Sequence, residues 1–361
     1  MLTEHKKLAM IRYGYEARNR REFYREFMKT WKLVQAEQLV LESGESAPLE
    51  SGEVKVHIDK VAFSATDAGI FHGKIPVSMP FVLGRHAVGT VVETQEGSYF
   101  QKGDVVMLNP YRPCEKCIEC KQGRPAKCSA LKMKGINSDG FLRDFINADE
   151  AFLQKLPETL SKDTALFTEY VALSIATLEK LDVQPGEHVA LLCAGKLSHI
   201  LAQLVTYYQA VPVIIDNDTD LLCQMQDGGY AYTCNASADV SSFVFSVTGG
   251  RMCEKVVYPS RSFTDVNLAL DLCENNGRIC IMGCLGSVLL GDLAKVLKKN
   301  LTVLAANNGS NELSAAINLL VNKTVNVQNI IGKHIPFEDA ATEIAATDTV
   351  YLQSHTLVID V

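Results

Sequence analysis

Four cysteines stand close together in this chain, and their spacing constrains the fold more than any other sequence feature. Four thiolates at such spacing can surround one tetrahedral zinc, and a site with four protein ligands leaves no position for a substrate. The spacing does not match the common iron–sulfur runs, and the charged neighbours make four buried free thiols a poor alternative. The pattern predicts one structural zinc per chain. Its ligands, in the form C-x₂-C-x₂-C-x₇-C, are Cys114, Cys117, Cys120 and Cys128.

Composition narrows the class of protein further. The chain has 361 residues, 47% of them hydrophobic and 21% charged, which is typical of a globular protein with two domains. Acidic residues exceed basic ones, 42 against 35, and this balance argues against a nucleic-acid partner. We find no secretory signal at the start and no stretch apolar enough to span a membrane. We therefore expect a cytoplasmic protein with reduced cysteines and no membrane partner.

The first thirty residues form an extension with a pattern of its own. Apolar residues recur three or four apart over Glu16–Thr30 and predict a helix there. The favoured interpretation is a helix that packs on its own protein. A helix that binds a membrane surface or a partner is the alternative, and the interspersed Glu22 and Glu26 weaken it.

Two different secondary-structure patterns follow along the chain. From Trp31, short β-rich runs separated by turn residues predict an irregular β domain, and after residue 185 apolar strands alternate with helices. Such alternation predicts an α/β fold with a parallel, doubly wound sheet. The expected early strands are Lys32–Leu41, Val54–Phe63, Gly89–Thr94 and Asp104–Leu108. The expected later strands are His188–Cys193, Val211–Asp216, Ser242–Val247, Arg278–Gly283, Leu301–Ala305 and Ser354–Val361, and the helices are Ser198–Ala210, Thr264–Glu274, Asp292–Lys299 and Ser314–Asn322.

Together, the β-rich first half, the cysteine cluster preceded by Gly103-Asp104-Val105-Val106 and the later alternation resemble the zinc-containing medium-chain dehydrogenase/reductase superfamily. The resemblance runs from Trp31 to Val361. It implies a GroES-like catalytic domain over 31–170 that is completed by 306–361, and a Rossmann nucleotide-binding domain over 171–305, after an N-terminal extension over 1–30. It also implies a cleft between the domains for a small-molecule substrate, and a homodimer or homotetramer.

The resemblance also locates the catalytic-zinc ligands of that family, and this chain departs from them. Ser64 stands where the family has cysteine, Arg85 where it has histidine, and Glu169 where its polyol branch has glutamate. Serine is a weak ligand, and arginine is a permanent cation without a lone pair to donate. We therefore expect no zinc there, with Arg85 paired to Glu169 or directed at a substrate oxygen. A rearranged metal site formed by His86, Glu169 and His72 is the alternative.

Two further side chains are implied in proton transfer by the same resemblance. Thr66 stands where the family relays the proton of the alcohol through a hydroxyl group, and His86 follows Arg85 directly. The predicted catalytic residues are Thr66, Arg85, His86 and Glu169.

The glycine-rich turn that binds a dinucleotide is also altered. The expected G-x-G-x-x-G reads Cys193-Ala194-Gly195-Lys196-Leu197-Ser198, and it keeps only the middle glycine, which lets the backbone approach a pyrophosphate. Asp216 ends the next strand, where an acid binds the adenosine ribose, and no arginine follows to receive a 2′-phosphate. We therefore expect NAD(H) rather than NADP(H). The predicted cofactor-binding residues are Gly195, Lys196, Leu197, Asp216 and Gly283.

Three functions compete on this evidence. The leading hypothesis is an NAD(H)-dependent oxidoreductase that transfers hydride to or from a small alcohol or carbonyl without a catalytic zinc. Arg85 then polarises the carbonyl, while Thr66 and His86 relay the proton. The second hypothesis is a non-catalytic binding or scaffold protein that keeps the fold and the structural zinc. The third is a zinc-dependent polyol or alcohol dehydrogenase with substituted ligands.

Overall fold

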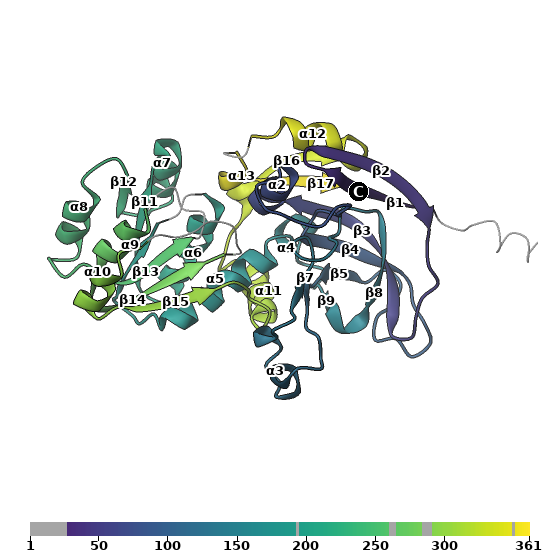
Figure 1. The fold of residues 1–361 in the computed structure, drawn as a ribbon, viewed down its shortest axis with the longest axis horizontal. Coiled ribbons are helices and arrows are strands. Elements are labelled where there is room, and N and C mark those ends of the chain that lie inside the picture. The colour runs from purple at the N-terminus through teal and green to yellow at the C-terminus, as the bar shows by residue number, and fades with distance from the viewer. Residues whose placement is uncertain (1–26, 193–194, 260–264, 284–290, 349–350) are drawn as a thin grey trace, which may run out of the picture.

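The computed structural model describes residues 27–192, 195–259, 265–283, 291–348 and 351–361. Two sheets lie side by side, with the helices α5 (Thr168–Leu181) and α11 (Leu313–Val321) between them (Figure 1). Almost every residue of α5 is buried, because this helix packs against α11, α6 (Lys196–Tyr207) and the strands of one sheet. Side chains of both halves of the molecule therefore meet around α5.

The first sheet has seven strands and belongs to the β-rich half. Its order is β16-β17-β3-β4-β5-β9, with β8 paired to β3. Side chains of β3 alternate between buried and half-buried along most of the strand, as expected for a sheet with one face in a core. The last strand of the chain pairs antiparallel with β3, so the C-terminal residues complete this sheet. The strands are β3 (Glu53–Phe63), β4 (His86–Glu93), β5 (Val105–Leu108), β8 (Phe145–Asp149), β9 (Leu153–Lys155), β16 (Ile331–Pro336) and β17 (Thr356–Asp360).

A two-stranded hairpin precedes this sheet and corrects part of the expected N-terminal helix. Residues 27–30 belong to the strand β1 (Phe27–Gln35), which pairs antiparallel with β2 (Gln38–Glu45). The prediction of a helix was wrong for residues 27–30, because pairing with β2 supplies the hydrogen-bond partners of their backbone. The Trp31 indole is buried, and its Nε1 donates to the Phe337 carbonyl oxygen at 2.8 Å. The expected strand over 32–41 is likewise a hairpin. The rest of the predicted helix lies outside the described residues.

The cysteine cluster lies in a lobe that projects at the bottom of Figure 1. The lobe runs between two short paired strands, β6 (Tyr111–Arg112) and β7 (Lys132–Met133). It contains one helical turn, α3 (Ile118–Lys121), and a 3₁₀ turn, η1 (Pro125–Lys127). None of the residues of α3 or η1 is fully buried, so these turns contribute little apolar packing.

The second sheet has six strands, all parallel, in the order β12-β11-β10-β13-β14-β15. The predicted α/β fold with a parallel sheet is thereby confirmed. Parallel strands need crossover connections, and helices of this half supply them. The strands are β10 (His188–Leu191), β11 (Val211–Asp216), β12 (Thr233–Asn235), β13 (Cys253–Pro259), β14 (Cys273–Met282) and β15 (Thr302–Ala306). The helices beside α5 and α6 are α7 (Thr219–Asp227), α8 (Val240–Val247), α9 (Val266–Leu272) and α10 (Leu293–Lys299).

One expected strand of this sheet is a helix. Residues 242–247 lie in α8, where the Asp239 side chain caps the helix by accepting a hydrogen bond from the Ser242 N–H at 3.0 Å. Only Val240 and Val244, four apart, are buried, so the short apolar run follows a helical period. The strand in that place of the sheet is β13, which pairs with β10 and β14.

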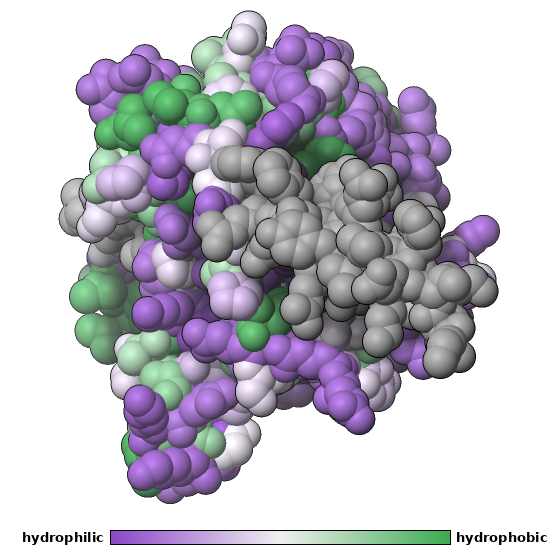
Figure 2. Space-filling model, turned by 90° about the vertical axis from the view of Figure 1, so that its right-hand side faces the viewer, coloured by the Kyte–Doolittle hydropathy of each residue, from purple (hydrophilic) through white to green (hydrophobic). Residues whose placement is uncertain are grey.

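The remaining elements are short connections around these two sheets. In the described parts of the chain, no helix has the length and apolar character needed to cross a membrane. Hydrophilic residues predominate over the visible, described part of the face in Figure 2. The short elements that connect the two sheets' strands and helices are α2 (Ala65–Phe71), η2 (Glu150–Phe152), α4 (Lys162–Ala165), η3 (Gln328–Ile330), η4 (Phe337–Asp339), α12 (Ala340–Ala346) and α13 (Tyr351–Ser354).

Candidate active site

A buried ion pair lies where the two halves meet. Arg85 directly precedes β4, and Glu169 lies in the first turn of α5. The side chains are only 5% and 4% exposed, and Arg85 Nη2 lies 2.6 Å from Glu169 Oε1. Gly84 allows this placement, because its φ of 88° is open mainly to glycine and an added Cβ would lie 2.8 Å from a side-chain carbon of Val61. Arg85 and Glu169, two of the predicted site residues, are thus brought together.

Tyr111 is a member of this cluster that sequence reasoning missed. Its hydroxyl donates to Glu169 Oε1 and accepts hydrogen bonds from Arg85 Nη2 at 3.0 Å and from the Gly309 N–H at 3.2 Å. The residue comes from β6, at the base of the cysteine lobe, and it is fully buried. Nothing in the sequence distinguishes this tyrosine from a core tyrosine.

His86 is the group of this cluster best placed to exchange a proton. Its Nε2 lies 2.9 Å from Glu169 Oε2, and its ring stacks on the Tyr170 ring, with centroids 4.4 Å apart. An ionised carboxylate only accepts hydrogen bonds, so Nε2 carries a hydrogen and donates it to Glu169. Nδ1 is buried and has no hydrogen-bond partner among the described residues. This arrangement is that of a base oriented by a carboxylate.

The helix start at Ser64 forms a second polar group beside the cluster. The Asp67 side chain accepts hydrogen bonds from the Ser64 N–H at 2.9 Å and from the Ser64 hydroxyl, and its other oxygen accepts from the Gly84 N–H at 2.9 Å. These contacts complete the cap of α2, whose first turn also contains Thr66. The Ser64 hydroxyl is therefore directed at Asp67 in this structure.

The cluster residues suit a zinc ion poorly. Arg85 has no lone pair, and both oxygens of Glu169 already accept hydrogen bonds from its neighbours. Among the residues that the structure describes, one group of three or more His, Cys, Asp or Glu side chains has donor atoms close enough together to share a metal ion. That group is the four cysteines of the lobe.

The pKa of Glu169 is held well below its ordinary range. Burial alone would raise it, but the charge of Arg85 and hydrogen bonds from His86 and Tyr111 outweigh this effect. Because the folded protein binds this proton more weakly than the unfolded chain does, ionised Glu169 stabilises the fold above its unfolded pKa of about 4.3. That stabilisation is lost as the pH falls below this value towards the folded pKa.

A Glu169→Gln variant tests this pH dependence. At pH 7 it should unfold with a free energy about 3–5 kcal/mol lower than that of the wild type, because Arg85 loses its buried counter-ion. Below pH 4.3 the difference should shrink by about 1.4 kcal/mol per pH unit. Urea unfolding from pH 7 to 3.5 measures both effects, and the exposed Glu338→Gln serves as the control. A difference that stays constant over this range would contradict the assignment.

The four cysteine sulfurs fit a zinc ion. All four Sγ atoms lie within 4.8 Å of one another, and Cys117 Sγ lies 3.5 Å from Cys120 Sγ and 3.8 Å from Cys128 Sγ. Zinc–sulfur bonds of about 2.3 Å place the sulfurs of a tetrahedral site roughly 3.8 Å apart. Backbone N–H groups also point at the sulfurs, as from Cys114 to Cys128 at 3.3 Å. The four-cysteine cluster is suited to a structural zinc, as the sequence predicted.

The expected ribose-binding acid lies at the C-terminal end of β11. Asp216 is fully buried, and one carboxylate oxygen accepts from the Asp218 N–H at 2.8 Å. The other oxygen, Oδ2, is buried without a partner among the described residues. Burial raises the pKa of Asp216 to about 6, although nearby backbone N–H groups lower it. The chemistry of this unpartnered oxygen fits the hydroxyls of a ribose.

Gly195 and Lys196, which were predicted to bind the pyrophosphate, contact the C-terminal segment of the chain instead. A Cβ on Gly195 would lie 2.1 Å from the Gln353 carbonyl oxygen, so the protein's own backbone packs against this glycine. Lys196 begins α6, but its side chain is buried and its Nζ donates to the Leu352 carbonyl oxygen at 2.8 Å. Burial lowers the pKa of Lys196 to about 7, although the charge of Asp67 raises it. Gly195 therefore contacts the backbone of the C-terminal segment, and Lys196 is engaged by that segment in this structure.

The other predicted cofactor-binding residues lie along the same sheet edge. Leu197 follows Lys196 in α6 and is partly buried against the core. Gly283 follows β14, and its N–H donates to the Ala306 carbonyl oxygen at 2.9 Å. Both lie just beyond the ends of parallel strands that precede them in the chain, which is where ligands bind in such sheets.

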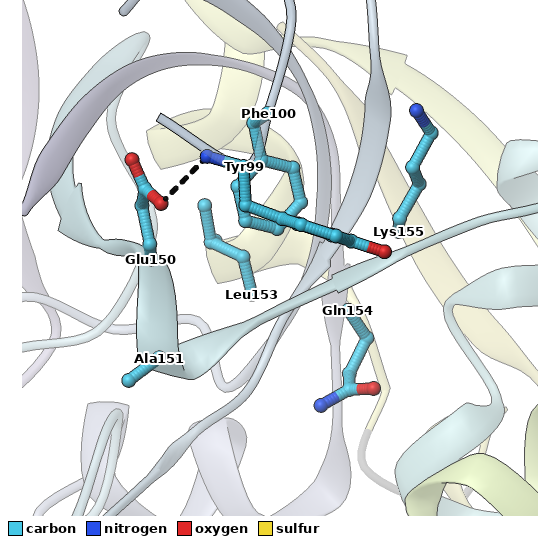
Figure 3. A pocket seen from close by; sticks show the side chains of 7 residues that line it. All are labelled: Tyr99, Phe100, Glu150, Ala151, Leu153, Gln154 and Lys155. Atoms are coloured by element: carbon cyan, nitrogen blue, oxygen red, sulfur yellow. Dashed lines mark hydrogen bonds between the residues drawn. The ribbon is translucent and has the colours of Figure 1, made fainter. Parts of the chain in front are cut away.

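Two hollows lie apart from this cluster. One, of about 450 Å³, is lined by residues of η2, β9 and the loop between β4 and β5, and the Tyr99 N–H donates to Glu150 at its rim (Figure 3). The other, of about 590 Å³, is lined by residues 76–81 and 136–139. Neither shares a lining residue with the Arg85–Glu169 cluster.

Comparison with known proteins finds similarity to dehydrogenases. Residues 50–158 match the family model of the alcohol dehydrogenase GroES-like domain. The chain is 26% identical over 297 residues to an uncharacterized zinc-type alcohol dehydrogenase-like protein of Haemophilus influenzae, covering 81% of this chain and 87% of the relative. It is 24% identical over 286 residues to a sorbitol dehydrogenase of Halalkalibacterium halodurans, covering 77% and 83%.

A solved structure supports the same fold. A short chain alcohol dehydrogenase from Escherichia coli, complexed with the cofactor NADH, has a TM-score of 0.83 at 18% identity, covering 93% of this chain and 99% of that one. A GroES-like β domain beside a parallel six-stranded sheet is the architecture that this chain shares with these dehydrogenases. These similarities confirm the resemblance to the zinc-containing medium-chain dehydrogenase/reductase family that was drawn from the sequence.

Proposed function

We propose that this protein is an NAD(H)-dependent oxidoreductase that interconverts a small alcohol and its carbonyl compound without a catalytic zinc. The observation that carries the proposal is the orientation of His86. Glu169 accepts a hydrogen bond from one ring nitrogen of His86 and also pairs with Arg85, while the other ring nitrogen is buried without a hydrogen-bond partner among the described residues. A proton acceptor and a fixed positive charge are the two contributions that alcohol oxidation needs from a protein.

In this proposal each member of the cluster has a separate role. His86 Nδ1 takes the hydroxyl proton of the alcohol, directly or through Thr66, and returns it in the reverse reaction. Glu169 stabilises the imidazolium that forms, as the carboxylate does in other base–carboxylate pairs. Arg85 supplies positive charge near the developing alkoxide, while Tyr111 and Arg85 keep Glu169 ionised. The bound nicotinamide would supply the hydride acceptor or donor.

Metal counting combined with turnover tests this function. Protein purified with excess zinc should contain one zinc per chain and should oxidise alcohols or polyols with NAD, followed by NADH absorbance. A Cys117→Ala variant should lose that zinc, which would assign the single ion to the lobe. A second zinc near Glu169, located by anomalous scattering, would restore the zinc-dependent alternative. Absence of both turnover and nucleotide binding would favour a non-catalytic relative.

The cofactor preference gives a second test. NADH should bind at least roughly tenfold tighter than NADPH, because the Asp216 carboxylate would repel a 2′-phosphate and would hydrogen-bond the free hydroxyls. An Asp216→Ser variant should reduce the ratio of NADH affinity to NADPH affinity, mainly by weakening the binding of NADH. Calorimetric titration with both nucleotides measures it, with the exposed Asp220→Ser as the matched control. Tighter binding of NADPH to the wild type would contradict the role of Asp216.

One observation favours the non-catalytic alternative. The backbone of Gln353 lies against Gly195, the only retained glycine of the turn. A protein that never binds a dinucleotide could keep that contact permanently, and its Gly195 would serve packing alone.

A further inference from the structure

Two consecutive residues of α5 contact the His86 side chain. Glu169 and Tyr170 both lie in the first turn of this helix, and their side chains are buried, as is that of His86. Glu169 Oε2 lies 2.9 Å from His86 Nε2, at the edge of the imidazole ring. The Tyr170 ring lies against the face of the same imidazole, with the centroids 4.4 Å apart and the ring planes 19° from parallel. The carboxylate and the aromatic ring therefore contact His86 from two different directions.

These two contacts restrict different motions of the imidazole. The hydrogen bond holds Nε2, but rotation about the Cβ–Cγ bond of a histidine has only a broad intrinsic preference. Such a rotation displaces Nδ1 more than Nε2, because Nδ1 lies farther from the axis of that bond. A ring stacked on the imidazole sets its plane and opposes the rotation. Glu169 alone therefore does not determine the direction in which Nδ1 points, whereas Glu169 and Tyr170 together do.

The Tyr170 ring is itself held by a contact with the nucleotide-binding half. Lys196 Nζ lies over this ring, 5.3 Å from its centroid. The ammonium group is fixed there, because it also donates to the Leu352 carbonyl oxygen at 2.8 Å. A cation over the face of an aromatic ring is attracted by the negative charge of that face. Tyr170 therefore presents a firmly placed surface to His86.

The hydroxyl group of Tyr170 contributes little to this arrangement. It is buried and has no hydrogen-bond partner within the described parts of the chain, and the Ser64 hydroxyl is directed at Asp67 instead. Burial and the charges of Asp67 and Glu169 raise the pKa of Tyr170, although Ser64 lowers it, so the hydroxyl keeps its proton and is a poor base. The contacts that Tyr170 makes with its neighbours are those of its ring.

We propose that Tyr170 is a positioning residue: its ring sets the plane of the His86 imidazole, so that Nδ1 faces the substrate oxygen from which it takes a proton. This inference rests on the proposed function, in which His86 is the proton acceptor. Proton transfer needs hydrogen-bond distance and alignment between acceptor and substrate. A misdirected acceptor slows the chemical step while the substrate still binds, so the role of Tyr170 is visible in kcat rather than in KM.

Two substitutions separate the ring of Tyr170 from its hydroxyl. Tyr170→Leu removes the planar surface and should lower kcat by about 10- to 100-fold, with KM and NADH affinity within about twofold of the wild type. Tyr170→Phe keeps the ring, so it should retain most of the turnover. It should also be at least as stable as the wild type in urea, because the lost hydroxyl has no partner. An unchanged kcat in Tyr170→Leu, or an equal loss of kcat in Tyr170→Phe, overturns the inference.

Phe337→Leu is the matched control for the loss of a buried ring. Phe337 is buried and its ring pairs with that of Trp31, with the centroids 6.3 Å apart, at a distance along the fold from the cluster. This variant should lose stability like Tyr170→Leu but keep kcat. An equal loss of kcat in Phe337→Leu would show a general effect of core packing and would overturn the inference. Tyr170→Met, which is also non-planar, replaces Tyr170→Leu if that variant does not fold.

NMR of the His86 ring gives a readout that does not depend on turnover. With ¹³C-labelled histidine and His86→Gln for assignment, relaxation of the ring C–H groups measures the mobility of the imidazole. The order parameter should be about 0.8 or higher in the wild type and in Tyr170→Phe, and clearly lower in Tyr170→Leu. Equal order parameters in all three proteins overturn the inference. If they differ as expected but no protein oxidises alcohols or polyols with NAD, the proposed function fails, and a catalytic role of this orientation fails with it.

Discussion

A Cys117→Ala variant is expected to lose its zinc and a large part of its folding free energy. The turns α3 and η1 bury no side chain fully, so metal bonds replace the hydrophobic core that this lobe lacks. Structural zinc contributes about 10–16 kcal/mol to small zinc domains, and in this larger protein we expect a loss of at least several kcal/mol. Elemental analysis and urea unfolding measure the two effects.

The matched control for this variant is Cys223→Ala. Cys223 is an exposed cysteine in α7, outside the cluster, and its replacement should leave zinc content and stability unchanged. Limited proteolysis should cut the Cys117→Ala protein within 114–131 much faster than the control. A Cys117→Ala protein that keeps one zinc per chain, or a wild type that contains iron instead, would contradict the four-cysteine assignment.

Arg85→Ala is expected to lower stability and to abolish turnover together. The change leaves Glu169 buried without its counter-ion, which costs about 3–5 kcal/mol of unfolding free energy. Loss of the cation beside the reacting oxygen should lower kcat by about 10²–10³. NADH affinity should remain nearly unchanged, because Asp216 binds at the other end of the cofactor. Calorimetry, urea unfolding and steady-state kinetics on the same preparation measure these three quantities.

A double variant separates a catalytic role of Arg85 from a purely structural one. In Arg85→Met/Glu169→Gln both buried charges are gone, so much of the lost stability should return. Turnover should stay abolished, because neither the cation nor the carboxylate that orients His86 is present. Recovery of turnover along with stability would show that Arg85 is not needed for the chemistry.

An exposed ion pair provides the control for Arg85. Arg124 pairs with Glu119 at 2.8 Å on the surface of the cysteine lobe. Arg124→Ala should cost less than about 1 kcal/mol and should leave turnover unchanged, because exposed pairs are screened by solvent. A loss of turnover in Arg124→Ala equal to that in Arg85→Ala would point to general damage rather than to a specific role.

The sequence by itself determined the features that depend on local pattern. Four thiols within fifteen positions define a zinc lobe without any knowledge of the fold, because their short spacing already brings them together. Apolar strands alternating with helices imply a parallel sheet, because each such strand is buried on both faces. The equally short run 242–247 was misassigned, since a few apolar residues fit either period, and the cap at Asp239 made it a helix.

Only the tertiary structure decided how distant residues meet. Tyr111 joins Glu169 because the base of the cysteine lobe packs on the start of α5, and nothing near Tyr111 in the sequence indicates that contact. Gly195 survives in a turn that resembles a phosphate-binding loop, yet it packs on Gln353, 158 positions further along the chain. That contact exists because the last strand returns to pair with β3, which brings the residues just before this strand onto the start of α6. Contacts of this kind depend on chain topology and strand register, which leave no local pattern in the sequence.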